Sequence, residues 1–267
     1  MPGPLASSAL GFLSDFSADG LPATKLLFGI CALVFALSMA SDALGGGGAG
    51  GFGLMGFSPS TSLRFGALLG PPIIGMEPWR VLSAVFLHGS ALHIAMNMLS
   101  LMNLGRTLEP HFRSARFLLL YLLSGMLGFC ATVWWRGELA FSVGASGAIF
   151  GLLGAFIGAL VIRRNPGWQR VFMSNLIMAF ALAYFVPNVD NSAHAGGFVS
   201  GFLLGILLEL ERQPRKRDRL VTGLAALGVV AVVASIALSA SSPVWKAQRR
   251  AEEARAERAE RRHLESE

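Results

Sequence analysis

The chain alternates long apolar stretches with short polar or charged loops. Backbone polar groups inside lipid must be paired within their own segment, and no stretch shows the two-residue alternation of a membrane barrel strand. The pattern therefore predicts an all-α polytopic membrane protein. Seven candidate transmembrane helices can be counted, at residues 26–41, 81–104, 117–135, 146–162, 171–186, 191–208 and 220–240. The shorter stretches need flanking residues, or a locally thinner bilayer, to cross about 30 Å of hydrocarbon.

The polar segments divide the chain into regions with different expected roles. An N-terminal segment, 1–25, precedes a core of six stretches, 26–210, whose longest loop runs over about 45–80 and opens on the flexible run GGGGAGGFG. A basic loop and the seventh stretch occupy 211–240. The tail, 241–267, is rich in charged helix-forming residues, so we expect a solvated helix there and assign it no function.

The distribution of basic residues predicts the orientation of the helices. With a cytoplasmic N-terminus, the inner loops of the first six helices carry twelve Lys and Arg residues and the outer loops carry three. The loop at about 45–80 would then lie on the outer face. A seventh crossing would place the tail outside as well, although the tail contains seven Lys or Arg and six Glu. Before the first helix there is a single basic residue, Lys25, and no recognisable targeting sequence, which favours a bacterial plasma (inner) membrane.

Composition supports the membrane interpretation and excludes several classes of protein. The 267 residues are 53% hydrophobic and 14% charged, against about 25% charged in ordinary soluble domains. The net charge of +6 could indicate nucleic acid as a partner, but the basic residues lie in loops between apolar stretches, so a lipid bilayer explains their positions better. Both cysteines, Cys31 and Cys130, lie inside apolar stretches, and we expect no disulfide framework, no metal site and no cofactor.

Four polar side chains inside apolar stretches are the candidates for chemistry, because such groups are costly in a bilayer. His93 and Asn97 are four residues apart, so they lie on one helix face and can address the same point. Ser146 and His194 lie in two other stretches. Taken alone, His93 and Asn97 are explained as well by hydrogen bonds between helices.

Glycine ridges predict which stretches pack closely, because small surfaces let helix backbones approach. The ridge residues are Gly147, Gly151, Gly154 and Gly158 in the fourth stretch and Gly197, Gly201 and Gly205 in the sixth. His194 shares the smooth face of its helix, whereas Ser146 sits about 100° from Gly147 on an ideal wheel. If the helix begins at Ser146, wheel geometry need not apply, and the free N–H groups at the helix start favour developing negative charge.

Together the four side chains fit covalent catalysis by serine. An imidazole within hydrogen-bonding reach takes the hydroxyl proton as the serine attacks a carbonyl, and it returns the proton to the leaving amine. The Ser146 N–H, the Asn97 amide and an N–H of His93 are the available donors for the oxyanion. Soluble alternatives fit poorly, because GASGA lacks the last glycine of the G-x-S-x-G elbow and no H-E-x-x-H occurs.

The ordered motifs of the chain resemble those of the rhomboid intramembrane serine proteases. The matching runs are WR at 79–80, HIAMN at 93–97, GASG at 144–147 and AHAGGFVSG at 193–201. They follow the family order over about residues 79–205, which is nearly half of the chain. GASG alone would be a weak signal, whereas the combination is specific.

The resemblance implies a rhomboid-like six-helix bundle with an additional C-terminal transmembrane helix, the six-plus-one type of many bacterial members. It implies a Ser–His dyad, with Ser146 as nucleophile and His194 as base, and it implies Asn97 and His93 as oxyanion stabilisers beside the Ser146 N–H. The flanking glycines of the same run are Gly144 and Gly147. Expected partners are membrane-anchored proteins, cut in or near their transmembrane helices, with no small-molecule cofactor.

The resemblance also implies supporting roles around this site. Phe150 stands where the family often has tyrosine, and its ring can still pack against the base. Trp79 and Arg80 would anchor the outer loop at the level of the lipid headgroups, and Glu109 would brace the loops. His88 is placed toward the same outer cavity and would help to retain water there.

Asp190 invites assignment as the third member of a triad, because it lies four residues before His194. The resemblance argues against a triad, and the run VDNSAH instead offers Asp190 or Asn191 as the cap of a helix N-terminus. His111 and His263 lie in polar segments and are expected to be surface histidines.

Two other functions are consistent with polar groups inside membrane helices. A transporter or channel would show paired broken helices in two similar halves, and no such repeat is visible. A catalytically inactive rhomboid-like protein would bind membrane-protein clients, but such proteins usually lack the nucleophile or the base, and both are present here. We therefore expect proteolysis, with a preference for substrate helices that unwind easily.

Overall fold

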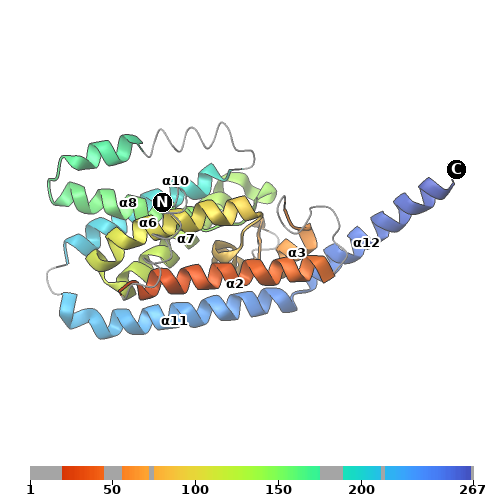
Figure 1. The fold of residues 1–267 in the computed structure, drawn as a ribbon, viewed down its shortest axis with the longest axis horizontal. Helices are drawn as coiled ribbons and strands as arrows, with labels where there is room; N and C mark the ends of the chain where they lie inside the picture. Colours follow the sequence, from red (N-terminus) through yellow and green to blue (C-terminus); the bar gives the residue numbers. More distant parts are fainter. Residues whose placement is uncertain (1–19, 45–55, 72–74, 175–188, 212–213, 266–267) are drawn as a thin grey trace, which may run out of the picture.

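The computed structural model describes residues 20–44, 56–71, 75–174, 189–211 and 214–265. Most of these residues are helical, and the long helices run along one common axis, with the last helix projecting from one end (Figure 1). The helices are α2 (Pro22–Leu44), α3 (Pro59–Arg64), α5 (Arg80–Ser83), α6 (Ala91–Phe112), α7 (Ser114–Arg136), α8 (Ser146–Ile162), α10 (Asn191–Glu209), α11 (Pro214–Ser241) and α12 (Pro243–Leu264). The shorter elements are the 3-10 turns η1 (Ala84–Phe86) and η2 (Gly137–Leu139) and the strands β1 (Leu68–Leu69) and β2 (Phe141–Ser142).

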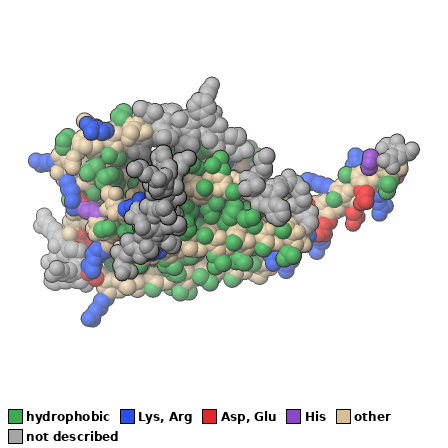
Figure 2. Space-filling view, viewed as in Figure 1, with side chains coloured by type: hydrophobic (Ala, Val, Ile, Leu, Met, Phe, Trp, Pro, Cys, Tyr) green, Lys and Arg blue, Asp and Glu red, His purple; other side chains and the backbone are tan. Residues whose placement is uncertain are grey.

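Apolar helices of membrane-spanning length dominate the described residues. Four are long and apolar enough to cross a bilayer: α2, α7 with the η2 turn, α10, and α11 from Asp218 onward. α8 is apolar but shorter, and it begins and ends where the sequence pattern predicted. Apolar side chains cover much of the visible face of the bundle, and charged side chains gather at its ends and along α12 (Figure 2).

The all-α polytopic fold predicted from the sequence is therefore confirmed. The protein is an integral multi-pass membrane protein. The count of seven crossings stays a prediction, because most of the stretch at 171–186 lies outside the described residues.

The second apolar stretch, 81–104, was expected to form a single helix, and that expectation is wrong. The α5–η1 segment meets α6 at 91°. Leu87 is extended, and Ser90 starts a new helix because its hydroxyl accepts the His93 N–H at 3.2 Å. The bend sets the start of α6, and with it the position of His93, at one end of the bundle.

α8 and α10 touch backbone to backbone along their glycine faces. A Cβ added to Gly197 would lie 2.0 Å from the Gly147 carbonyl oxygen, and one added to Gly201 would lie 2.0 Å from the Gly151 carbonyl oxygen. Real Cβ atoms essentially never come so close, so only glycine permits the contact. The close packing predicted from the glycine ridges is confirmed. We call this contact, formed by Gly147, Gly151, Gly197 and Gly201, the glycine seam.

The segment that joins α2 to α6 folds back onto the bundle; its described residues, 56–71 and 75–90, are called here the α2–α6 connection. Ser58 caps α3 by accepting the Thr61 N–H at 3.2 Å. The strand β1 of the connection pairs antiparallel with β2, which leads into α8. A small apolar cluster fixes the connection beside α2; it comprises Val34, Leu63, Phe65, Ala67 and Leu87.

Buried Glu109 joins α6 to the start of α2, at the end of α2 that lies away from α3. Its carboxylate accepts the N–H groups of Ala23 and Thr24, both at 2.8 Å, and the Thr24 hydroxyl at 2.6 Å. A carboxylate at a helix N-terminus satisfies free donors and complements the helix dipole. The residue therefore holds two helices together, in line with the bracing role that the resemblance implied.

Ion pairs occupy the same end of the bundle. Arg116, on α7, binds Asp218 at 2.6 Å and Glu211 at 3.0 Å. His111, expected as a surface histidine, lies 3.0 Å from Glu209 and is partly exposed. These contacts tie α6 and α7 to α10 and α11.

The charged tail forms α12, as predicted, and none of the residues in Pro243–Leu264 is buried. The first turns of α12 nevertheless lie against α3. The tail therefore shares one end of the molecule with the α2–α6 connection (Figure 1). No pattern in the sequence predicts that contact.

Candidate active site

Ser146 and His194 lie at the starts of the two helices that form the glycine seam. Ser146 is the first residue of α8, and His194 lies in the first turn of α10. The Ser146 Oγ and the His194 Nε2 are 2.8 Å apart, a hydrogen-bonding distance. Both side chains are half-buried. The seam brings the helices close enough for a side chain as short as serine to reach the imidazole.

The residues before Ser146 form a tight turn that faces His93. Gly144 has a φ of +132°, a backbone conformation that favours glycine. A Cβ on Gly144 would also lie 2.8 Å from Cε1 and Nε2 of His93. The Nε2 edge of His93 therefore looks onto the turn that leads into Ser146.

The His93 ring is oriented by the bend before α6. The Gly89 N–H points to the Nδ1 of His93 at an N···N distance of 3.4 Å, so Nδ1 is the acceptor nitrogen. In a neutral imidazole the proton then sits on Nε2, where it can be donated toward Ser146. The bend thus sets both the position and the tautomer of this histidine.

Asn97 lies one turn after His93 on α6 and is buried. Its side-chain nitrogen donates to the His93 carbonyl oxygen at 2.9 Å. An amide NH₂ has two hydrogens, so one remains for another acceptor. His93 and Asn97 thus lie on one face of α6, as their four-residue spacing predicts.

Phe150 covers the His194 ring from one side. The two rings stack with centroids 4.2 Å apart and an interplanar angle of 14°. Because Phe150 lies one turn after Ser146, the same helix presents the hydroxyl and the ring that holds its partner. The Phe150 side chain packs against the imidazole, and it has no hydroxyl with which to form a hydrogen bond.

Asp190 is the N-cap of α10, which was one of the two roles considered for it. Its Oδ1 accepts the Ala193 N–H at 3.1 Å and the Ser192 hydroxyl at 2.6 Å, and its Oδ2 accepts the Thr132 hydroxyl at 2.8 Å. Among the described residues, no hydrogen bond joins this carboxylate to the His194 ring. The structure therefore supports the cap and gives no support to a triad.

Hydrogen bonds keep the Asp190 carboxyl ionised. Burial by itself would raise the pKa of Asp190, but the hydrogen bonds that it accepts, including those from Ser142 and Ser192, hold its pKa below the ordinary value. A charged cap complements the N-terminal end of α10.

His88 and Arg80 lie deeper than the sequence suggested. The His88 side chain is fully buried and meets the His93 ring edge-on, with centroids 5.2 Å apart. Arg80 was expected at the lipid headgroups together with Trp79, and for Arg80 that expectation is wrong, because it has no exposed surface. Its guanidinium binds Glu77 and the carbonyl oxygens of the α2–α6 connection. Trp79, next to it, is half-buried.

A contact that sequence reasoning missed ties the site to the α2–α6 connection. The Gly144 N–H donates to the carbonyl oxygen of Ala84 at 2.9 Å. No side-chain pattern could indicate it, because both groups belong to the backbone. The turn before Ser146 is thus held from outside its own helix.

The Rhomboid domain profile matches residues 75–211, which include every residue of the candidate site. The chain belongs to the rhomboid family.

Among rhomboid relatives, RHOMBOID-like protein 5 of Arabidopsis thaliana is 42% identical over 167 residues, covering 60% of this chain and 53% of the relative. Rhomboid protease GluP of Bacillus subtilis (strain 168) is 35% identical over 166 residues, covering 61% of this chain and 32% of the relative. Rhomboid-like protease 3 of Toxoplasma gondii is 29% identical over 183 residues, covering 66% of this chain and 69% of the relative. The chain spans about half the length of the plant relatives or less. Since plant and bacterial rhomboids both match, the expected bacterial type is not established.

Proposed function

We propose that the protein is an intramembrane serine endopeptidase that hydrolyses peptide bonds in or near the transmembrane helices of membrane-anchored proteins. The observation that carries the proposal is the 2.8 Å contact between the Ser146 Oγ and the His194 Nε2 at the start of α8. Membership of the rhomboid family, and a relative named as a rhomboid protease, support it.

The Ser146 hydroxyl acts as the nucleophile. His194 Nε2 accepts the hydroxyl proton while the Oγ forms a bond to the carbonyl carbon of the substrate. The protonated imidazole then gives the proton to the leaving amine as the peptide C–N bond breaks, which leaves an acyl ester on Ser146. Water attacks the ester with His194 again as base, and the acid product and the free serine are released.

The negative oxygen formed in each step needs donors placed in advance. We assign this role to the Ser146 N–H, the Nε2–H of His93 and the side-chain amide of Asn97. The first lies at the helix N-terminus, where no hydrogen bond from it is seen among the described residues, and the second is supported by the contact between Gly89 and Nδ1. The third has one hydrogen left after its bond to the His93 carbonyl.

The ends of the bundle support the proposed orientation. The end of the bundle where Arg116 pairs with Asp218 carries Arg116 of α7 and Arg163, which directly follows α8, whereas Ser146 opens the opposite end of α8. By the excess of Lys and Arg in cytoplasmic loops, the ion-paired end and the N-terminus are cytoplasmic, and Ser146 lies toward the outer face. A catalytic core over 26–210 and a plasma membrane location complete this proposal.

Labelling with a serine-reactive fluorophosphonate tests the nucleophile. The detergent-purified protein should be labelled and should cut a membrane-anchored reporter, and Ser146→Ala should lose both activities. Ser200→Ala is the matched control, because among the described residues the Ser200 hydroxyl bonds to carbonyl oxygens of its own helix, α10. Full reporter cleavage by Ser146→Ala would exclude this serine as nucleophile. An unlabelled and inactive wild-type chain would favour the inactive, client-binding alternative.

A further inference from the structure

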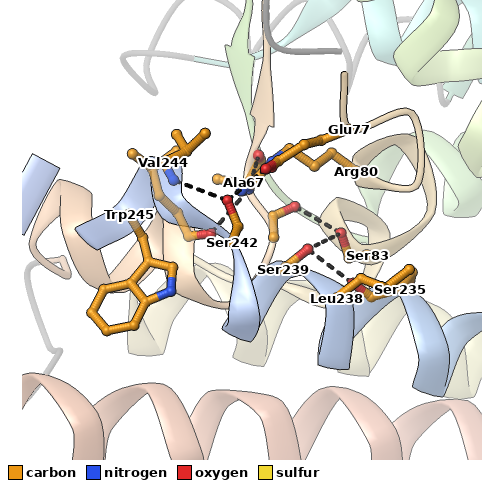
Figure 3. Close-up of polar contacts among 12 residues, drawn as sticks. Ala67, Glu77, Arg80, Ser83, Ser235, Leu238, Ser239, Ser242, Val244 and Trp245 are labelled. Carbon is orange, nitrogen blue, oxygen red and sulfur yellow. Dashed lines mark hydrogen bonds and ion pairs between the residues drawn. The ribbon is translucent and has the colours of Figure 1, made fainter. Parts of the chain in front are cut away.

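The last two helices lie outside the region that the rhomboid profile matches, yet they make buried polar contacts with the α2–α6 connection. The profile ends at residue 211, and α11 begins at Pro214. Figure 3 shows the junction of α11 and α12 against the connection, with side chains from both pointing toward one another. Such contacts are unexpected for a helix whose only task is to lie in lipid.

A buried ion pair forms the centre of the contact. Arg80 Nε donates to Glu77 Oε2 at 2.5 Å, and Arg80 Nη1 donates to the carbonyl oxygens of the connection. The second carboxylate oxygen, Glu77 Oε1, accepts the hydroxyl of Ser242 at 2.5 Å. Ser242 also caps α12, because its Oγ accepts the Val244 N–H at 3.0 Å. One serine between the two helices therefore completes the hydrogen bonds of a carboxylate in the connection.

Two further contacts lie on either side of this centre. On α11, the Ser239 Oγ is 3.5 Å from the Ser83 Oγ, and Ser83 donates to the Gly66 carbonyl oxygen at 3.0 Å. On α12, the Glu252 carboxylate accepts the Ser60 N–H at 3.1 Å and the Ser60 hydroxyl at 2.5 Å.

An aromatic residue of α12 closes the same surface. The Arg64 guanidinium lies 5.0 Å from the centre of the Trp245 ring, and the indole nitrogen donates to the Ala240 carbonyl oxygen at 2.9 Å. We call Ser239, Ser242, Trp245 and Glu252 the polar clamp.

The segment that the clamp holds is the one that touches the turn before Ser146. Ser83 is followed by Ala84, whose carbonyl oxygen accepts the Gly144 N–H at 2.9 Å. A second link is the β1–β2 pair, in which Leu68 lies opposite Ser142. Both links reach residues two to four positions before Ser146. The clamp is thus connected to the candidate site through a short chain of direct contacts.

Tight packing and burial restrict the movement of the residues that form these contacts. Gly66 has a φ of +103°, and a Cβ on it would lie 2.2 Å from the Ser83 Oγ. Arg80 and Ser83 have no exposed surface. Loss of a donor would leave a buried carboxylate oxygen unsatisfied, which is costly and favours a shift of the connection.

We propose that the polar clamp is a positioning device for the proposed protease, in which α11 and α12 hold the α2–α6 connection so that the turn at Gly144 presents Ser146 and its N–H correctly to His194 and His93. This inference rests on the proposed function. Its residues touch neither substrate nor nucleophile, so they act through the connection.

The decisive comparison is Ser242→Ala against Ser241→Ala. Ser241 is the neighbouring residue, is exposed, and bonds only to the Leu238 carbonyl oxygen of its own helix. We expect Ser242→Ala to lower kcat and the rate of fluorophosphonate labelling about tenfold or more, since small misplacements of reacting groups have effects of this size. KM for a membrane-anchored reporter should change little. Ser242→Thr keeps the hydroxyl and should restore the rate.

A second pair of variants keeps the test independent of the cap that Ser242 provides to α12. Glu252→Ala removes the acceptor for Ser60, whereas Glu253→Ala removes only an exposed pair with Arg249. We expect a few-fold loss of kcat for the first and none for the second. Equal labelling rates for Ser242→Ala and Ser241→Ala, together with equal rates for the two glutamate variants, would overturn the proposal.

Hydrogen exchange separates failure of the clamp from failure of the proposed function. The amides of residues 141–146, above all the Gly144 N–H, should exchange faster in Ser242→Ala and Glu252→Ala than in their controls. Unchanged exchange overturns the clamp whatever the activity. A wild-type chain that is neither labelled nor active overturns the proposed function, and with it the catalytic role of the clamp. In that case the exchange result still decides whether the clamp holds the turn at Gly144.

Discussion

The glycine seam and the polar clamp fix the same small region by opposite physical means. The seam joins α8 to α10 through backbone contact at its glycines. The clamp joins α11 and α12 to the α2–α6 connection through hydroxyl, carboxylate and guanidinium groups, most of them buried. One contact excludes added volume, and the other depends on polar groups that pair with one another.

The difference follows from what each contact must do. Inside lipid there is no hydrophobic force between helices, so close packing of small residues is an effective way to join two spans. The α2–α6 connection is not a span, and its backbone groups need hydrogen-bond partners wherever they are buried. Substitutions that change volume should therefore damage the seam, and substitutions that remove polar groups should damage the clamp.

Loss of the buried guanidinium at the clamp should have the largest effect. Arg80→Ala leaves the Glu77 carboxylate buried with the Ser242 hydroxyl, and we expect the free energy of unfolding in detergent to fall by about 3–5 kcal/mol. Arg136→Ala, at the end of α7, is the control and should cost well under 1 kcal/mol. Limited proteolysis should cut Arg80→Ala first within the connection. Equal unfolding energies for the two variants would show that the ion pair does not hold the connection.

A single added methyl group should damage the seam. Gly201→Ala places a Cβ 2.0 Å from the Gly151 carbonyl oxygen, so the helices must move apart, and we expect a loss of about 1–3 kcal/mol with slower labelling of Ser146. Gly223, on α11, has nothing within 4 Å of the same position. Gly223→Ala should therefore be neutral or slightly stabilising, by up to about 1 kcal/mol. A thermal unfolding series distinguishes the two, and equal midpoints would mean that the seam is not close-packed.

Removal of the α10 cap tests whether hydrogen bonds matter at the end of the seam as well. Asp190→Ala should lower the free energy of unfolding by about 1 kcal/mol, and Asn191→Ala, at the exposed neighbouring position, should not. Because the pKa of Asp190 is held below its ordinary value in the folded protein, its contribution is present above the unfolded pKa and is lost as the pH falls through the folded pKa. The difference between wild type and Asp190→Ala should be constant from pH 6 to 7 and shrink below about pH 4. A difference that grew on acidification would contradict this account.

The last expected effect, similar in size to that of Asp190→Ala, concerns the ring that stacks on the proposed base. Phe150→Ala should cost about 1 kcal/mol of stacking and slow fluorophosphonate labelling several-fold. Phe150→Tyr keeps the ring and should stay close to wild type. Labelling rates, measured at equal concentrations of folded protein, check this prediction. A Phe150→Ala variant that is labelled as fast as wild type would show that the seam alone positions His194.

Features that depend on local pattern were predictable from the sequence. The bounds of α8 follow from one uninterrupted apolar stretch, and the contact of α8 with α10 follows from two glycine ridges. The shared face of His93 and Asn97 follows from helical spacing. In each case the information lies within single apolar stretches, each read by itself.

Features that depend on distant or backbone partners were not predictable. The break before Ala91 was missed because the apolar run continues through it, although Gly89 and Ser90 mark a helix start. The burial of Arg80 was not predictable, because its partner Glu77 binds Ser242, which lies 165 residues away in the sequence. A serine at the end of an apolar helix gives no indication of what it binds.

The glycine seam also restricts the route by which a peptide can approach Ser146. A surface with no room for one methyl carbon has no room for an extended polypeptide, so a scissile segment cannot slide in between α8 and α10. The two helices form one wall behind the proposed nucleophile. If the proposed function holds, delivery of the substrate depends on the parts of the protein that face this wall, and selectivity for one membrane protein over another has to be built there.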